Sequence, residues 1–168
     1  LIPQSMSIGE VQKVLQNLLA ENVPIKDLPL ILEALADAIH QVKSIEELTE
    51  AVRKKLGRAI CKQYLGEDGR LHVLTLDPGL EHYFQRVFAR EENLDPQVFR
   101  AIFNQLSGNV EKMVGLGHFP VLVVPGKIRR NLRTLLAGYL PQLVVLAMEE
   151  IPREVELKIE GAVKGGQG

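Results

Sequence analysis

The 168-residue sequence has one cysteine, no tryptophan and no long hydrophobic run. Because Cys61 is the only cysteine, no intramolecular disulfide can form, and a reducing compartment is expected. No apolar segment approaches the roughly 20 residues of a membrane-spanning helix, and no signal peptide stands at the start. The formal net charge of -1 argues against nucleic-acid or membrane binding over the whole surface, although a local basic patch is compatible with it. We therefore expect a soluble chain. Since it begins at Leu1 without an initiator Met, we also expect it to be a piece of a longer protein.

The sequence also contains few groups arranged for chemistry. Cys61 follows Ile60 on a predicted helix with no local base to activate it, so we interpret it as a small buried side chain. The Gly115-x-Gly117 pair precedes a predicted strand, whereas a dinucleotide fingerprint follows one, and a helix end explains it better. No two histidines stand at a metal-ligand spacing such as i, i+4; they are His40, His72, His82 and His118. We predict no catalytic residue, no cofactor, no metal site and no enzyme activity.

The first third of the chain shows apolar residues at helical spacing. Ser7-x-x-Glu10 and Ser44-x-x-Glu47 have the form of a capping box, and Asp27 is a suitable N-cap. These signals predict three helices, beginning near residues 8, 28 and 45, with the third extending past residue 60. Their predicted buried stripes are Ile8, Val11, Val14, Leu15, Leu18 and Leu19; then Leu28, Ile31, Leu32, Leu35, Ala36 and Ile39; then Leu48, Val52, Leu56, Ala59 and Ile60.

After the turn-forming cluster Gly66-Glu-Asp-Gly69, strand and helix patterns alternate. Strands are predicted at residues 71–76, 119–124, 143–148 and 154–160, and helices after Asp77, Asp95 and Gly126. A strand, a helix and a strand within residues 119–148 predict a parallel βαβ unit, and the alternating pattern of the last strand predicts an edge position. The predicted fold class is α+β: a three-helix unit (1–66), then a small α/β subdomain with a βαβ unit and an edge strand (67–163), and a flexible tail (164–168).

The most prominent polar feature is a cluster of four cations in the first turns of a predicted helix, although helix starts usually favour acids. One interpretation is a contact surface for an anionic partner. The other is that these side chains cover apolar surface or pair with glutamates. Exposed aromatics interleaved with the cations, as a nucleic-acid site would need, are absent from this stretch. The candidate contact residues are Lys127, Arg129, Arg130 and Arg133.

Three stretches together resemble one known family. They are EVQKVLQNLLAENVPIKDLPLILEALAD (10–37), LTEAVRKKLGRAICKQY (48–64) and FPVLVVPGKIRRNLRTLLAGYLPQLVVLAMEEIP (119–152). They resemble the C-terminal cytoplasmic region of the FlhA/InvA family of type III secretion export gates, and the Gly57–Ile60 stretch suggests its flagellar branch. The resemblance covers nearly the whole chain, from Leu1 to about Val163.

The resemblance implies a role in protein transport at the cytoplasmic face of the bacterial inner membrane. This chain would be the third, helical, and the fourth, α/β, cytoplasmic subdomains of an export gate that assembles as a ring. Its implied partners are export chaperone-cargo complexes, the export ATPase complex and the export-switch protein, with self-association in the ring and no nucleic acid. The membrane part and two subdomains are absent, and with them most of the family's chaperone-docking dimple, which residues 1–7 would at most border. The alternative from the residues alone is a nucleic-acid-binding module that uses the basic helix at 127–133.

Overall fold

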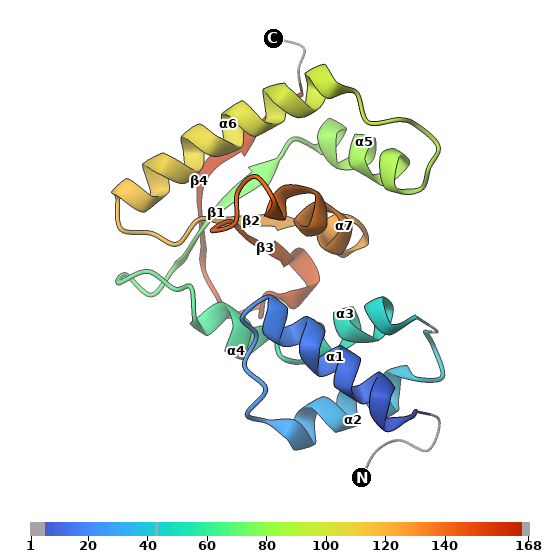
Figure 1. Cartoon of the computed structure of the whole chain (residues 1–168). Helices are drawn as coiled ribbons and strands as arrows, with labels where there is room; N and C mark the ends of the chain where they lie inside the picture. Colours follow the sequence, from blue (N-terminus) through green and yellow to red (C-terminus); the bar gives the residue numbers. More distant parts are fainter. Residues whose placement is uncertain (1–5, 43, 166–168) are drawn as a thin grey trace. The chain divides into compact units, whose positions relative to one another are not determined.

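The computed structural model describes residues 6–42 and 44–165, and the chain forms two compact units (Figure 1). The helical unit comprises Leu1–Gln63 together with Glu150–Pro152, and the α/β unit comprises Tyr64–Glu149 and Arg153–Gly168. The expected boundary after residue 66 lies slightly beyond this division, and the transfer of residues 150–152 to the helical unit was not expected. Residues 166–168 of the predicted tail, and residues 1–5, lie outside the described part. Among the described helices, none has the length and hydropathy needed to cross a membrane.

The described part of the helical unit contains four helices where three were predicted. They are α1 (Ile8–Ala20), α2 (Leu28–Ala38), α3 (Ile45–Lys55) and α4 (Gly57–Lys62). The predicted third helix divides at Leu56, and α4 begins at the following glycine.

All three predicted N-caps are present in the helical unit. The amide of Glu10 donates to Ser7 Oγ and the Ser7 amide donates to Glu10 Oε1, which completes the capping box of α1. Asp27 Oδ1 accepts from the amide of Leu30 at the start of α2, and Ser44 Oγ accepts from that of Glu47 at the start of α3. Each cap satisfies an amide that has no partner within its own helix.

The core of the helical unit forms where α3 packs against both α1 and α2. All three predicted stripes are partly wrong. Ile8 is 73% exposed, Leu19 is 53% exposed and Leu28 is 42% exposed, and Ala36 and Ala59 are exposed as well. On α2 the buried face includes Ala34 and Ala38, whose small side chains allow close packing, so the apolar residues on the other side of the helix remain at the surface. The buried residues of α1 and α2 are Val11, Val14, Leu18, Ile31, Ala34, Leu35 and Ala38.

A buried ion pair joins Glu150 to the helical unit. Arg53 Nε donates to Glu150 Oε2 at 2.5 Å and Nη2 donates to Oε1 at 3.1 Å, and the two side chains are only 2% and 1% exposed. A carboxylate oxygen of Glu21 lies 3.6 Å from Arg53 Nη1. A Cβ added at Gly57 would lie 1.9 Å from the Glu150 carbonyl oxygen, so this close approach requires glycine.

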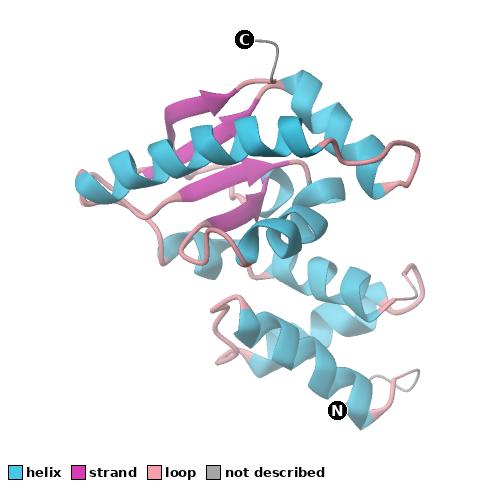
Figure 2. Cartoon of the chain, turned by 45° about the horizontal axis from the view of Figure 1, so that its top comes forward, coloured by secondary structure: helices cyan, strands magenta, loops and turns pink. Residues whose placement is uncertain are grey.

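The α/β unit contains a four-stranded sheet, drawn in magenta in Figure 2. Its strands are β1 (Leu71–Leu76), β2 (Val121–Val124), β3 (Val144–Ala147) and β4 (Leu157–Val163), in the order β3-β2-β1-β4. Every neighbouring pair is parallel. The predicted βαβ unit is confirmed as β2, a helix and β3, and the predicted edge position of the last strand is confirmed as well.

Helices α5 (Pro78–Phe88), α6 (Pro96–Gly115) and α7 (Gly126–Ala137) contribute to one apolar core with the sheet. Helix α6 lies along β4, and α5 packs against α7 (Figure 1). The strand residues in this core alternate along each strand, so they all point to the same face of the sheet. The three helices therefore cover that one face of the sheet. These strand residues are Leu74, Leu76, Leu122, Val124, Val145 and Val163.

The edge strand β4 departs from its predicted alternation. Its apolar residues Leu157 and Ile159 are 43% and 58% exposed. The register with β1 is interrupted, since Val73 pairs with Ile159 and Leu74 pairs with Gly161. Glu160 is therefore the extra residue of a bulge, which redirects its side chain.

Candidate functional site

Helix α7 carries the four predicted contact cations, and the structure places one of them differently from the other three. Lys127 is exposed, and Arg130 and Arg133 are half-buried. These three are spaced by three residues, so neighbouring members lie on adjacent positions of the helix surface. In the described part of the chain, Lys127 and Arg130 take part in no ion pair. We call Lys127, Arg130 and Arg133 the basic face of α7.

Arg129 is completely buried and is not available at the surface. Its Nη1 donates to the backbone carbonyl of Val145 at 2.8 Å, and its side chain is 0% exposed. The sequence held a signal for this, because Arg129 has the same helical spacing to Leu132 and Leu136, which are both buried. Arg129 therefore supports the packing of α7 on the sheet, and we leave it out of the contact surface.

The start of α7 is capped from another element. The amide of Gly126 donates to Glu149 Oε1 at 3.0 Å. A Cβ at Gly126 would lie 3.2 Å from the carboxylate oxygens, so the glycine lets the acid approach. A carboxylate at this position complements both the free amides and the positive end of the helix dipole. This acid explains how the helix tolerates a cationic first turn.

A second surface lies on α2 in the helical unit, where a shallow groove opens along the helix. Leu28 is exposed and Leu32 is half-buried, although both were predicted to face the core. Because these apolar side chains are only partly covered within the described helical unit, they form a candidate contact surface, the α2 groove. Its lining residues are Leu28, Pro29, Leu32, Glu33 and Ala36.

The cysteine and two of the histidines assessed for chemistry need a structural account. Cys61 is 0% exposed, and burial, followed by the nearby Glu150 carboxylate, raises the pKa of its thiol to about 11. A thiol that is buried and protonated at neutral pH is a poor nucleophile, as the sequence indicated. The histidines are different: His72 and His118 come together in the α/β unit with Glu160, although no spacing along the chain showed it.

Comparison with known proteins identifies the family of this chain. The FHIPEP family model matches residues 1–156. This chain belongs to the FHIPEP family. The chain is 38% identical over 167 residues to the flagellar biosynthesis protein FlhA of Proteus mirabilis, covering 99% of this chain and 24% of that protein. It thus spans about a quarter of the length of this curated relative, and the predicted resemblance to the FlhA/InvA export-gate proteins is confirmed.

Two solved structures of other proteins have the same fold. The MxiA protein of Shigella flexneri matches with a TM-score of 0.83 and 24% identity, over 95% of this chain and 51% of that chain. The nonameric EscV cytosolic domain from the type III secretion system matches with a TM-score of 0.75 and 28% identity, over 93% of this chain and 47% of that chain. Family membership gives no support to the nucleic-acid alternative, and the burial of Arg129 removes one of the four cations it would use.

Proposed function

We propose that this FHIPEP chain is a cytoplasmic module of a flagellar type III export gate, that it forms part of a homo-oligomeric ring, and that it contacts chaperone-cargo complexes and other export components. The observation that carries the proposal is the likeness to a nonameric cytosolic domain of a type III secretion system at 28% identity. The proposal includes no catalytic role. In it, the module lies at the cytoplasmic face of the inner membrane and is held there by parts of the full protein outside this chain.

The α2 groove is the part of the helical unit best suited to meet another copy of the chain. In the described part of the unit Leu28 is exposed and Leu32 is half-buried, and fully burying such side chains contributes roughly 1.5–3 kcal/mol each. In a ring of identical subunits each groove would meet the same surface of the next subunit, which is a heterologous contact that closes by rotation.

Self-association tests this part of the proposal. The variant Leu28→Lys places a charge in the groove, and Leu19→Lys places the same charge on an exposed leucine of α1 outside it. Sedimentation equilibrium over a range of concentrations is expected to show self-association of the parent chain and of Leu19→Lys, and weaker self-association of Leu28→Lys. Equal association of both variants would remove the groove from the ring contact.

The basic face of α7 is the surface proposed for partners that carry acidic segments. The double variant Lys127→Glu/Arg130→Glu reverses one exposed and one half-buried charge on the basic face, and Arg100→Glu/Lys112→Glu makes the same change on exposed positions of α6. Equilibrium binding of purified chaperone-cargo complexes, the export-switch cytoplasmic domain and the ATPase complex is compared for both. Loss of binding only in the α7 variant supports the surface, and equal binding by both excludes it.

A longer protein containing the whole cytoplasmic region completes this test. Binding by the present chain alone would place part of the docking surface in it, whereas binding only by the longer protein would make this chain mainly ring scaffold. If neither folded protein bound any export component and neither self-associated, the export-gate proposal would be wrong. Binding to DNA or RNA that weakens steeply with salt would then favour the nucleic-acid alternative.

A further inference from the structure

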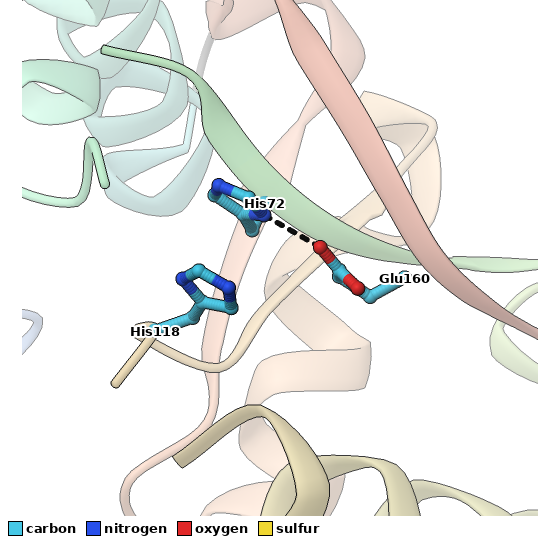
Figure 3. Close-up of side chains that lie close together, drawn as sticks. All are labelled: His72, His118 and Glu160. Atoms are coloured by element: carbon cyan, nitrogen blue, oxygen red, sulfur yellow. Dashed lines mark hydrogen bonds and ion pairs between the residues drawn. The ribbon is translucent and has the colours of Figure 1, made fainter. Parts of the chain in front are cut away.

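Three side chains with metal-ligating atoms converge at one end of the α/β unit. His72 comes from β1, Glu160 from β4, and His118 from the loop between α6 and β2. One ligand atom from each lies within 4.8 Å of those from the other two. Figure 3 shows the carboxylate of Glu160 directed at the His72 ring, with the His118 ring lying close to that of His72. Three segments that are distant in sequence thus meet at one point.

The fold holds two of these side chains by specific local devices. Glu160 is the extra residue of the β4 bulge, and its Oε2 lies 2.5 Å from His72 Nδ1. His118 follows Gly117, whose φ of +86° turns the chain at the end of α6, and the His118 amide donates to the Met113 carbonyl. Bulges in sheets are frequent where a side chain has to be redirected for function.

The opposite nitrogen of His72 already has the partner that a metal-binding histidine needs. His72 Nε2 lies 3.0 and 3.1 Å from the two oxygens of Asp68. Asp68 is supplied by the Gly66–Gly69 turn, which packs so closely that a Cβ on Gly66 would lie 3.0 Å from His72 Cδ2. A carboxylate that accepts from one ring nitrogen fixes the tautomer and leaves the other nitrogen free to bind a metal. Here that other nitrogen is Nδ1, the one that faces Glu160.

We propose that His72, His118 and Glu160 bind a divalent transition-metal ion of the zinc class in the α/β unit. Two imidazoles and one carboxylate are a ligand set that suits Zn²⁺ and its neighbours. The carboxylates of Glu160 and Asp68 supply negative charge on both sides of His72, which favours a dication between the ligands. His118 and Glu160 are half-buried, so solvent reaches the site and a further coordination position is left for water.

Binding of a metal ion by all three residues requires the His118 ring to change its orientation. The two imidazole rings are stacked, with centroids 3.7 Å apart and planes inclined by 11°. Each nitrogen lone pair lies in the plane of its own ring, so nearly parallel rings cannot both direct a lone pair at one ion about 2.0–2.1 Å away. The half-buried His118 ring therefore turns out of the stack to complete the site, while His72 and Glu160 keep their places.

The simpler arrangement is an ion pair in which His72 is protonated between its two acids. Hydrogen bonding to Glu160 raises the pKa of His72, and the same bond lowers the pKa of Glu160. That arrangement gives no part to His118. Removal of the His118 ring therefore separates the two explanations.

The test is titration of the purified, tag-free chain with Zn²⁺ by calorimetry and with Co²⁺ by visible absorption, at about pH 8. The parent chain is expected to bind one ion, with Co²⁺ bands typical of a site of low coordination number. His118→Ala and Glu160→Gln are each expected to weaken binding by about tenfold or more, and Asp68→Asn by about 10–100-fold. The matched control is His82→Ala, which removes an exposed histidine of α5 and should bind as the parent does.

Three results would overturn the proposal. They are absence of stoichiometric binding by the parent chain, unchanged binding in His118→Ala, and equal weakening in His82→Ala. Circular dichroism establishes that each variant is folded. If His118→Ala is unfolded, His118→Asn takes its place, because it keeps a polar side chain of similar reach and lacks the imidazole.

Discussion

Replacing Arg53 by Met is expected to destabilise the helical unit far more than removal of a surface charge would. Arg53 and Glu150 are joined by two hydrogen bonds, of 2.5 and 3.1 Å, and neither side chain is more than 2% exposed. Met retains much of the apolar stem of Arg but leaves the Glu150 carboxylate without its guanidinium partner. Breaking a buried pair by removing one member costs about 3–5 kcal/mol, whereas exposed pairs contribute about 0–1 kcal/mol.

The double variant Arg53→Met/Glu150→Leu makes this prediction specific to charge burial. With both members replaced by apolar groups, neither charge of the buried pair remains, and such replacements are often neutral or stabilising. We therefore expect the double variant to be more stable than Arg53→Met, with a coupling free energy of about 2 kcal/mol or more between the two positions.

Urea unfolding followed by two signals provides the assay. The chain has no tryptophan, and its three tyrosines, Tyr64, Tyr83 and Tyr139, all belong to the α/β unit, so tyrosine emission reports that unit alone. Far-ultraviolet circular dichroism reports the helices of both units. The reasoning is refuted if Arg53→Met costs less than about 1 kcal/mol, the range of exposed pairs, or if the double variant is as unstable as the sum of the single variants.

Three further predictions concern single positions. Gly57→Ala should destabilise the chain by several kcal/mol or prevent folding, because its Cβ would meet the Glu150 carbonyl at 1.9 Å. The matched change Gly108→Ala in α6 meets nothing within 4 Å and should stabilise the chain by roughly 0.5–1 kcal/mol. In thermal unfolding, Gly57→Ala should therefore lower the melting temperature and Gly108→Ala should raise it. Cys61 should react with a thiol reagent only in the unfolded chain. Since its pKa rises from 9.0 to about 11 on folding, the free energy of unfolding should fall as the pH rises between these values. A fast reaction of the folded chain, or a free energy of unfolding that is unchanged over that range, would contradict this. Glu149→Ala should cost about 0.5–2 kcal/mol by removing the cap of α7, and Glu149→Gln, which keeps an acceptor oxygen, should cost less; equal losses in tyrosine-detected unfolding would show that the acceptor is not what matters.

Local signals predicted the elements of this fold well. The strand at residues 71–76 has the expected bounds, and the caps at Ser7, Asp27 and Ser44 mark helix starts as expected. These features depend on residues within one or two turns of each other, so a short stretch of sequence contains all the interactions that determine them. The parallel βαβ unit was predictable for a related reason, because a strand, a helix and a strand of that length have few ways to pack.

Features that depend on contacts between distant residues were not predictable in the same way. The division of the third helix before Gly57 accompanies a close approach to the backbone of Glu150, and Arg53 and Glu150 are separated by 97 positions. His72 and Glu160 are 88 positions apart, so a search for histidines at i, i+4 could not find their meeting. Here the tertiary fold supplied the information, through the pairing of β1 with β4 and the bulge between them.

The basic helix α7 shows why burial has to be known before a functional variant is designed. Reversing Arg129 and Arg130 together is the natural choice from sequence, since both belong to the cluster. However, Arg129→Glu would place a carboxylate in the buried position from which the guanidinium now donates to the Val145 carbonyl, and two acceptors would then face each other. Any loss of partner binding in that variant would confound misfolding with a lost contact. Reversal at Lys127 and Arg130 leaves Arg129 in place, so an effect on binding without an effect on unfolding would belong to the surface alone.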